Sequence, residues 1–491
     1  MQPEQNTKEL YSELSILCEY AIEKALEFKE NDKLIRIPHE YLPAKEVNFQ
    51  TESFDYDWES TKYFDYFEWP VETFSALLND DLMQSTQSFS VMQQLIDLKV
   101  NEAFAKGSIF SLLRDIIKEA VNTQLDVNYY VSTFLTDIDC LLNKKPFVWN
   151  VHLWLQNVHL ESDQIKLTEG VFLRRPIKDQ LGITSIKTTY VKEFDKMMSR
   201  KLPATAILSF SVSCSKKDAG ELYPSELLYE IEVWLNIFRL FKPSSISIYY
   251  QSIFPNSILE YGFSENKNQP FDKFWEGKVD YKDVSTHRLY LKKSEEAILQ
   301  EFIVKVKPTI SQTSPKTYLS GNHFDLALHR YNDSLLKSEV NAYKILSSMT
   351  SIEALLSNEN TEISFKCRLR VSKLVSFFGF NPIDAFEKMK KAYDLRSRLV
   401  HGSKTSEKMN SLLEFARNYA HEIINFNRIC ILIFLQLKNI KEKDDLIKLI
   451  DQSFISDASN ESLRELITEN VVIPIPNPYF QITIKPEEQN Q

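Results

Sequence analysis

The chain has 491 residues, of which 43% are hydrophobic and 26% charged, and its formal net charge is -10. This length allows two or three domains with complete hydrophobic cores, and an aromatic content of 12% argues against disorder over most of the chain. Only 9 glycines occur, and neither G-x-x-x-x-G-K-[ST] nor G-x-G-x-x-G is present, so the sequence lacks the phosphate-binding loops of P-loop, kinase and Rossmann proteins.

The cysteines and the apolar segments indicate in which cellular compartment the protein is expected. Five cysteines lie far apart without a C-x-x-C pair, which is typical of buried thiols in a reducing compartment. The N-terminal residues "MQPEQNTKELYSEL" lack a basic region followed by an apolar run, and the most apolar run, "ICILIFLQL" from Ile429, is shorter than a bilayer-spanning helix. We therefore expect a cytoplasmic protein without membrane association, and a buried helix at this run.

The first predicted domain, residues 1–144, is mainly helical. Its first helix has apolar residues along one face, namely Leu10, Leu14, Leu17, Ala21 and Ala25. The segment 51–74 then contains nine aromatic and seven acidic residues. Either it forms strands and turns whose rings enter a core, or it is an acidic-aromatic surface for a protein partner. A helical pattern returns over residues 80–142.

The middle region, residues 145–308, has the alternation of strands rich in β-branched and aromatic residues. The expected strands lie within 147–162, 164–175, 204–214 and 244–254. A helix over 225–242 separates the last two, which predicts an α+β domain.

The third predicted domain, residues 309–470, is a bundle of helices with short connections. One of its helices has clear termini: Asn381 is a favourable N-cap, Pro382 suits the first turn, and Gly402 suits the end. Residues 471–491 are interrupted by prolines and are expected to form an extended arm. The predicted fold class is therefore α+β multidomain, with a helical N-terminal segment, a strand-rich middle and an all-α C-terminal bundle.

The histidines do not form a metal-binding pattern. His39 and His421 are each followed by glutamate, but neither has the second histidine of H-E-x-x-H. His152 and His159 are seven apart in a predicted strand and would point to opposite faces. We expect neither a metal site nor a cofactor.

Positive charge is concentrated in residues 363–404. This stretch contains ten basic and only three acidic residues, so its net charge is +7 and that of the remainder of the chain is -17. The stretch is either a solvated helix face or a surface for a phosphate backbone.

The same stretch contains a combination suited to RNA chemistry, Arg396 and His401 in "YDLRSRLVHGSK". A histidine can take or give the proton when a 2′-hydroxyl attacks the adjacent phosphate, and an arginine can stabilise the developing charge. However, residues five apart diverge by about 140° on an ideal helix. The two therefore need a helix end or a second subunit to meet, whereas Arg398 shares a face with His401.

The motif resembles that of HEPN domains, and most closely the ApeA-like pattern Tyr-x-x-Arg-Ser-x-x-x-His-Gly. Upstream, "ALHRYNDSLL" and "SSMTSIEALLS" are similar to the first helices of that subfamily. The resemblance covers about 320–437. Many HEPN nucleases have Asn or Asp directly after the arginine, where this chain has serine. The middle strands resemble, more loosely, regions found beside such domains.

The resemblance implies a dimer whose two motifs face each other, acting as a metal-independent endoribonuclease. Such proteins are often toxins or abortive-infection effectors of antiviral defence, with sensor or inhibitory regions before the HEPN domain. The expected partners are RNA, a second copy of the chain, and a protein trigger or inhibitor. The expected catalytic residues are Arg396 and His401. The expected supporting residues are Glu353, Tyr393, Ser397 and Gly402. The expected RNA-binding residues are Arg368, Arg370, Lys390, Lys391, Arg398 and Lys404.

Two other hypotheses remain open. The domain could bind RNA or nucleotides without cleaving them and act through a partner, as in a toxin-antitoxin pair, because the positive stretch supports this equally well. Alternatively, the acidic-aromatic segment 51–74 could make the chain an interaction scaffold.

Overall fold

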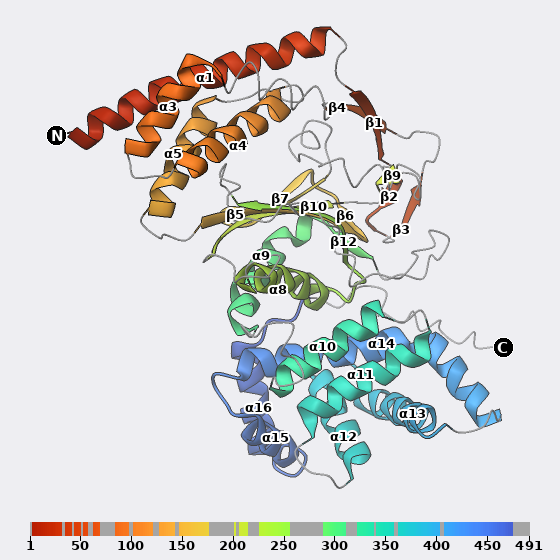
Figure 1. Ribbon diagram of the computed structural model, residues 1–491. Coiled ribbons are helices and arrows are strands. Elements are labelled where there is room, and N and C mark those ends of the chain that lie inside the picture. Colours follow the sequence, from red (N-terminus) through yellow and green to blue (C-terminus); the bar gives the residue numbers. More distant parts are fainter. Residues whose placement is uncertain are drawn as a thin grey trace. The chain divides into compact units, whose positions relative to one another are not determined.

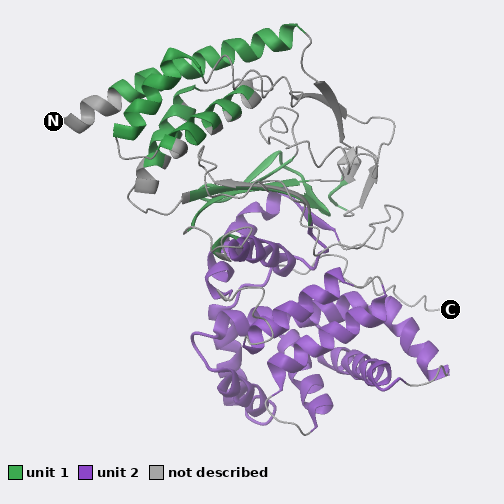
Figure 2. Cartoon of the chain, viewed as in Figure 1, with its two compact units in different colours: residues 1–227, 248–280 green, residues 228–247, 281–491 purple. Residues whose placement is uncertain are grey.

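The computed structural model contains two compact units, which Figure 2 shows in different colours. Unit 1 comprises residues 1–227 and 248–280, and unit 2 comprises residues 228–247 and 281–491. The residues that the structure describes are 2–31, 35–41, 44–50, 53–56, 62–68, 84–97, 102–120, 127–142, 147–175, 201–202, 206–214, 225–255, 288–310, 322–337, 340–357, 362–402 and 407–474.

The described helices of unit 1 share one hydrophobic core. They are α1 (Gln2–Glu30), α3 (Thr86–Asp97), α4 (Glu102–Ala120) and α5 (Val127–Leu142), shown in Figure 1. The predicted apolar face of α1, from Leu10 to Ala25, is buried in this core, against residues such as Leu112 and Phe134. Packing of one face in this way confirms the amphipathic pattern, because an apolar face is stable in water only when another element covers it.

The strands before α3 form two small sheets. Their bounds are β1 (Ile35–Tyr41), β2 (Ala44–Asn48), β3 (Ser53–Tyr56) and β4 (Lys62–Glu68). β4 pairs antiparallel with β1, which also pairs with β9 (Lys201–Leu202), and β2 pairs with β3. The acidic-aromatic segment thus contains two strands, while its side chains lie outside the described residues.

In the described part of unit 1, the largest sheet has five strands in the order β11-β5-β10-β8-β7. Their bounds are β5 (Phe147–Gln156), β7 (Gln164–Thr168), β8 (Val171–Arg174), β10 (Ala206–Cys214) and β11 (Ser247–Pro255). β10 pairs antiparallel with β5 and β8, and the hairpin of β7 and β8 turns at Gly170, whose φ of 70° suits glycine. These strands confirm the predicted strand-containing middle region. β6 (Val158–Leu160) follows β5 after Asn157.

Unit 2 contains the C-terminal helices together with two helices that precede them. Its elements are α8 (Ser225–Phe241), β12 (Leu289–Leu291), η2 (Lys293–Glu295), α9 (Glu296–Val306), η3 (Lys307–Thr309), α10 (His323–Leu336), α11 (Asn341–Leu356), α12 (Ile363–Ser376), α13 (Pro382–Val400), α14 (Glu407–Leu437), α15 (Lys443–Gln452) and α16 (Asp457–Asn470). The expected division at residue 309 differs from the division into units, which groups α9 and almost all of α8 with the bundle.

Buried polar side chains join α8 to the bundle. Arg428 on α14 donates hydrogen bonds from Nη1 to the carbonyls of Leu240 and Phe241, at 2.8 and 3.0 Å. The Tyr331 hydroxyl donates to the Arg239 carbonyl at 2.6 Å. These contacts satisfy the last carbonyls of α8 and place a positive charge where the helix dipole is negative. The end of α8 is thereby bound to the bundle it precedes.

Helix α14 is the centre of the bundle. Its C-terminal half is buried from Glu422 to Leu437, which confirms the buried helix predicted at Ile429. Among the described residues it alone is long and apolar enough to cross a bilayer, but 94% of that window is buried within the protein. The chain after α16 begins as an extended segment, in which Val472 exchanges two hydrogen bonds with the Gln436 side chain. Residues 475–491 of the expected arm lie outside the described residues.

Candidate active site

Helix α13 positions the motif. The Asn381 side chain accepts hydrogen bonds from the backbone N–H groups of Ile383 and Asp384, at 2.9 and 3.2 Å, and so caps the first turn. At the other end, the His401 N–H donates to the Ser397 carbonyl at 3.1 Å, and Gly402 has a φ of 63°. The predicted helix ends are confirmed, since Asn satisfies free N–H groups and glycine adopts the left-handed conformation at low cost.

Arg396 faces inward from α13 and is held by α11. Its Nη2 atom donates a 2.7 Å hydrogen bond to Oε2 of Glu353, and their side chains are only 25% and 17% exposed. The Arg396 guanidinium carbon also lies 5.7 Å from the centre of the Tyr393 ring, within reach of a cation–π interaction. Three of the expected site residues are therefore brought together by the packing of α13 on α11.

The ion pair leaves two polar atoms unused. Oε1 of Glu353 and Nε of Arg396 are buried without a hydrogen-bond partner in the described part of the chain. Burial raises the pKa of Glu353, and this effect exceeds the lowering caused by the Arg396 charge. An additional donor or acceptor at this position would thus meet unsatisfied groups in a partly dehydrated site.

His401 is the C-cap residue that follows α13, and it is exposed, as is Gly402. Within the described residues, no hydrogen bond or ion pair connects its ring to Arg396 or Glu353. Ser397 contributes its backbone carbonyl to the helix end, and no hydrogen bond of its hydroxyl is found there. Among the described residues, the two expected catalytic side chains are therefore not joined by a hydrogen bond.

Arg370, one of the expected RNA-binding residues, is buried in this structure. Its side chain is only 3% exposed and forms a double hydrogen bond with Asp451 of α15, at 2.8 and 2.6 Å. It also donates to the carbonyl of Leu356 at the end of α11. Lys443 donates to two neighbouring carbonyls, those of Ala354 and Ser357, at 2.9 Å each. Arg370 therefore holds helices together and caps α11 just beyond Glu353.

Part of the remaining positive stretch is also neutralised. Lys388 is buried and lies 2.6 Å from both Glu422 and Asp384. Glu422, Glu353 and Asp451 all lie outside residues 363–404, so at least three of the ten basic side chains are paired with carboxylates from elsewhere. Asp451, Glu422 and Lys443 are not among the expected site residues, because no local sequence pattern predicts which distant groups they contact.

The other expected RNA-binding residues are more accessible. Lys390 and Lys391 are exposed, the first 3.8 Å from Glu387 and the second 5.8 Å from the Phe415 ring centre. Arg368 is half-buried between the rings of Phe365 and Phe386. Arg398 is half-buried, and Lys404 lies outside the described residues.

Two histidines of unit 1, His152 and His159, have described side chains that lie largely inside the fold. His152 Nδ1 lies 2.9 Å from Ser209 Oγ, to which Arg174 donates at 3.1 Å. Burial, assisted by the Arg174 charge, lowers the pKa of His152 to about 4. His159 follows the strand break at Asn157, whose φ is 62°, and is buried. Among the described residues, no group of three or more His, Cys, Asp and Glu side chains could hold a metal ion.

Comparison with known proteins adds no relative to these observations: no family model, no curated protein and no solved structure matches the chain.

Proposed function

We propose that the chain is a metal-independent endoribonuclease of the HEPN type, with Arg396 and His401 as its catalytic residues. The observation that carries this proposal is the arrangement on α13. A half-buried arginine is oriented by a carboxylate from α11, and an exposed histidine ends the same helix. The order of residues from Tyr393 to Gly402 is the one that the resemblance to ApeA-like HEPN domains requires.

The chemistry uses proton transfer and charge stabilisation alone. The 2′-oxygen of the RNA attacks the adjacent phosphorus, the bond to the 5′-oxygen breaks, and a 2′,3′-cyclic phosphate and a 5′-hydroxyl result. His401 takes the proton from the 2′-hydroxyl or gives one to the leaving oxygen. Arg396 has five N–H donors, so the N–H groups that Glu353 leaves unused would bind the phosphate oxygens. Glu353 is the positioning residue.

In a dimer, Arg396 of one protomer could lie beside His401 of the other. Because His401 is exposed and not bonded to Arg396, we place the reactive centre where two α13 ends meet across a two-fold axis. Lys390, Lys391 and Arg398 would bind the RNA backbone beside it. Unit 1 would act as the sensor or inhibitory region that controls this cytoplasmic nuclease, with an antiviral effector as the biological setting.

The test is an RNA-cleavage assay in the presence of a chelator. The full-length protein is compared with His401→Ala, Arg396→Ala and, as control, Lys448→Ala, which changes an exposed residue of α15. We expect the chelator to leave cleavage unchanged, the two motif variants to lose it, and the control to cleave like the parent. Undiminished cleavage by His401→Ala would overturn the proposal.

The runner-up is a module that binds RNA without cleaving it. The exposed Lys390 and Lys391 support this alternative equally well, because they would bind the RNA backbone whether or not His401 cleaves it. This function predicts RNA binding that weakens as salt rises, with no products under any activating condition.

A further inference from the structure

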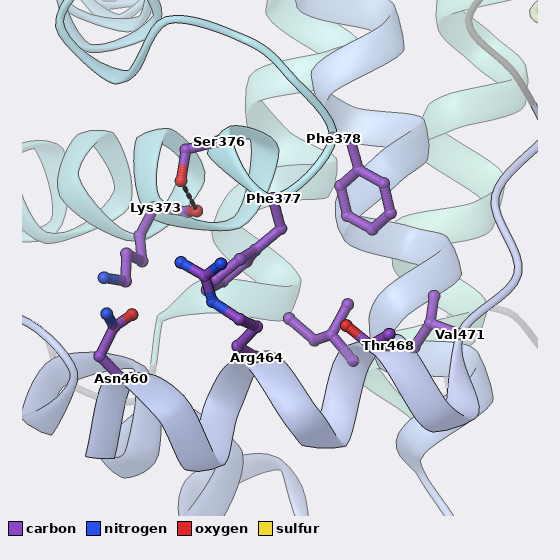
Figure 3. Close-up of a pocket in the computed structure, with 9 residues that line it drawn as sticks. Lys373, Ser376, Phe377, Phe378, Asn460, Arg464, Thr468 and Val471 are labelled. Atoms are coloured by element: carbon purple, nitrogen blue, oxygen red, sulfur yellow. Dashed lines mark hydrogen bonds between the residues drawn. The ribbon is translucent and has the colours of Figure 1, made fainter. Parts of the chain in front are cut away.

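A pocket of about 500 Å³ lies between the end of α12 and helix α16, as Figure 3 shows. This volume is within the range of small-molecule sites. Its lining residues come from the C-terminal turn of α12 and from successive turns of α16. They are Lys373, Ser376, Phe377, Phe378, Asn460, Arg464, Ile467, Thr468 and Val471.

Two cations converge on this pocket around one aromatic ring. Lys373 Nζ and the Arg464 guanidinium carbon lie 5.7 and 5.9 Å from the centre of the Phe377 ring, and Lys373 is also 5.6 Å from the centre of the Phe454 ring. Cation–π attraction keeps the two positive groups together although they repel each other. Accordingly, the pKa of Lys373 is lowered, first by burial and then by the Arg464 charge.

The surroundings do not neutralise these charges. Among the described residues, the polar contact of Lys373 is a 3.4 Å hydrogen bond to the Ser453 carbonyl, and no carboxylate pairs with it. Arg464 has one acidic neighbour, Glu461, at 3.8 Å, and both of these side chains are more than half exposed. Such a loose exposed pair contributes little. An anion at this position would therefore be attracted by two cations at once.

The uncharged lining indicates what the anion is attached to. Oδ1 of Asn460 is buried without a hydrogen-bond partner, so it would accept from a hydroxyl or amino group. Phe378, Ile467 and Val471 provide the apolar part of the lining, to which Thr468 adds a hydroxyl group. The Ser376 hydroxyl, in contrast, already donates to the Lys373 carbonyl at 2.7 Å. The lining thus combines a doubly cationic part with an apolar part and one open acceptor.

We propose that this pocket binds a nucleoside monophosphate. Its phosphate contacts Lys373 and Arg464, its base lies along the apolar part of the lining, and a hydroxyl or amino group donates to Asn460. None of these residues belongs to the Arg396–His401 motif, so the proposal stands independently of ribonuclease activity.

Isothermal titration of the full-length protein with AMP tests the proposal, with adenosine and inorganic phosphate as the two partial ligands. We expect AMP to bind more tightly than either, and to bind more weakly as salt rises. Lys373→Gln and Arg464→Gln should each weaken AMP binding by about tenfold or more, since each removes a charged partner. The matched control Lys448→Gln should bind AMP like the parent.

Two further variants keep the test independent of folding defects. Glu461→Gln removes the competing carboxylate and should tighten AMP binding, an effect that a damaged fold would not produce. Asn460→Asp keeps the size of the side chain and should weaken binding by adding a negative charge. Absence of AMP binding, or binding that is insensitive to Lys373→Gln and Arg464→Gln, would overturn the assignment.

Discussion

Glu353 and Arg396 form one hydrogen-bonded ion pair between α11 and α13, at 2.7 Å, while each retains a buried atom that no described residue satisfies. This relationship orients the guanidinium without using all its donors. A residue fully committed to structure, such as Arg370, instead satisfies its donors with Asp451 and a backbone carbonyl. Arg396 therefore keeps a donor that a ligand could use, whereas the hydrogen bonds of Arg370 are made within the fold.

The first prediction concerns Glu353 as a positioning residue. Glu353→Ala should slow RNA cleavage by about tenfold or more, because Arg396 loses the acceptor that holds its side chain in place. Glu353→Gln retains an acceptor oxygen and should recover most of the rate. Undiminished cleavage by Glu353→Ala in single-turnover assays would argue against this positioning role.

The second prediction tests the composite site. Arg396→Ala and His401→Ala proteins should each be inactive alone. When they are unfolded together and refolded, half of the dimers are mixed, and each mixed dimer has one intact pair of motif residues. Roughly a quarter of the parental cleavage rate should therefore return for a two-fold symmetric site. No recovery, despite mixed dimers detected by native mass spectrometry, would place both residues in one chain.

The third prediction distinguishes two basic residues of the positive stretch. Arg370→Ala should lower the free energy of unfolding by about 2 kcal/mol, because it leaves the Leu356 carbonyl and Asp451 without their donor. Lys390→Ala should leave stability unchanged and weaken RNA binding, with a smaller salt dependence. Urea unfolding and filter binding of both variants measure the two effects. Equal stability of Arg370→Ala and the parent would contradict the structural role.

The fourth prediction is a pH dependence in unit 1. Because the pKa of His152 falls from 6.5 to about 4 on folding, the unfolded chain binds more protons between these values. Its stabilising contribution is complete above pH 6.5 and is lost as the pH falls towards 4. At pH 5 the loss amounts to about 2 kcal/mol.

His152→Gln is the comparison for this prediction. The variant should lack this part of the pH dependence, so the stability difference between parent and variant should shrink from pH 7.5 to pH 5. Hydrogen exchange of peptides covering β5 and β10 reports on the strands that contain His152 and Ser209. A difference that stays constant over this pH range would show that His152 protonates equally in both states.

Local sequence patterns predicted several helices and strands correctly. The apolar face of α1, the strands β5 and β10, and the ends of α13 follow from side-chain periodicity and capping, which depend on residues close in sequence. The separation of Arg396 from His401 also follows from the pitch of one helix. The grouping of α8 with the C-terminal bundle does not, because it depends on Arg428 and Tyr331 meeting its last turn.

The sequence by itself determined that α13 begins at Pro382 after the Asn381 cap, ends shortly before Gly402, and has an arginine and a histidine five residues apart near its end. Only the tertiary structure decided what each charge does. Arg370 and Lys390 look alike in a list of basic residues, yet one is buried against Asp451 and the other is exposed. Charge and spacing are local properties, whereas burial and ion pairing depend on which distant helix supplies the neighbouring carboxylate.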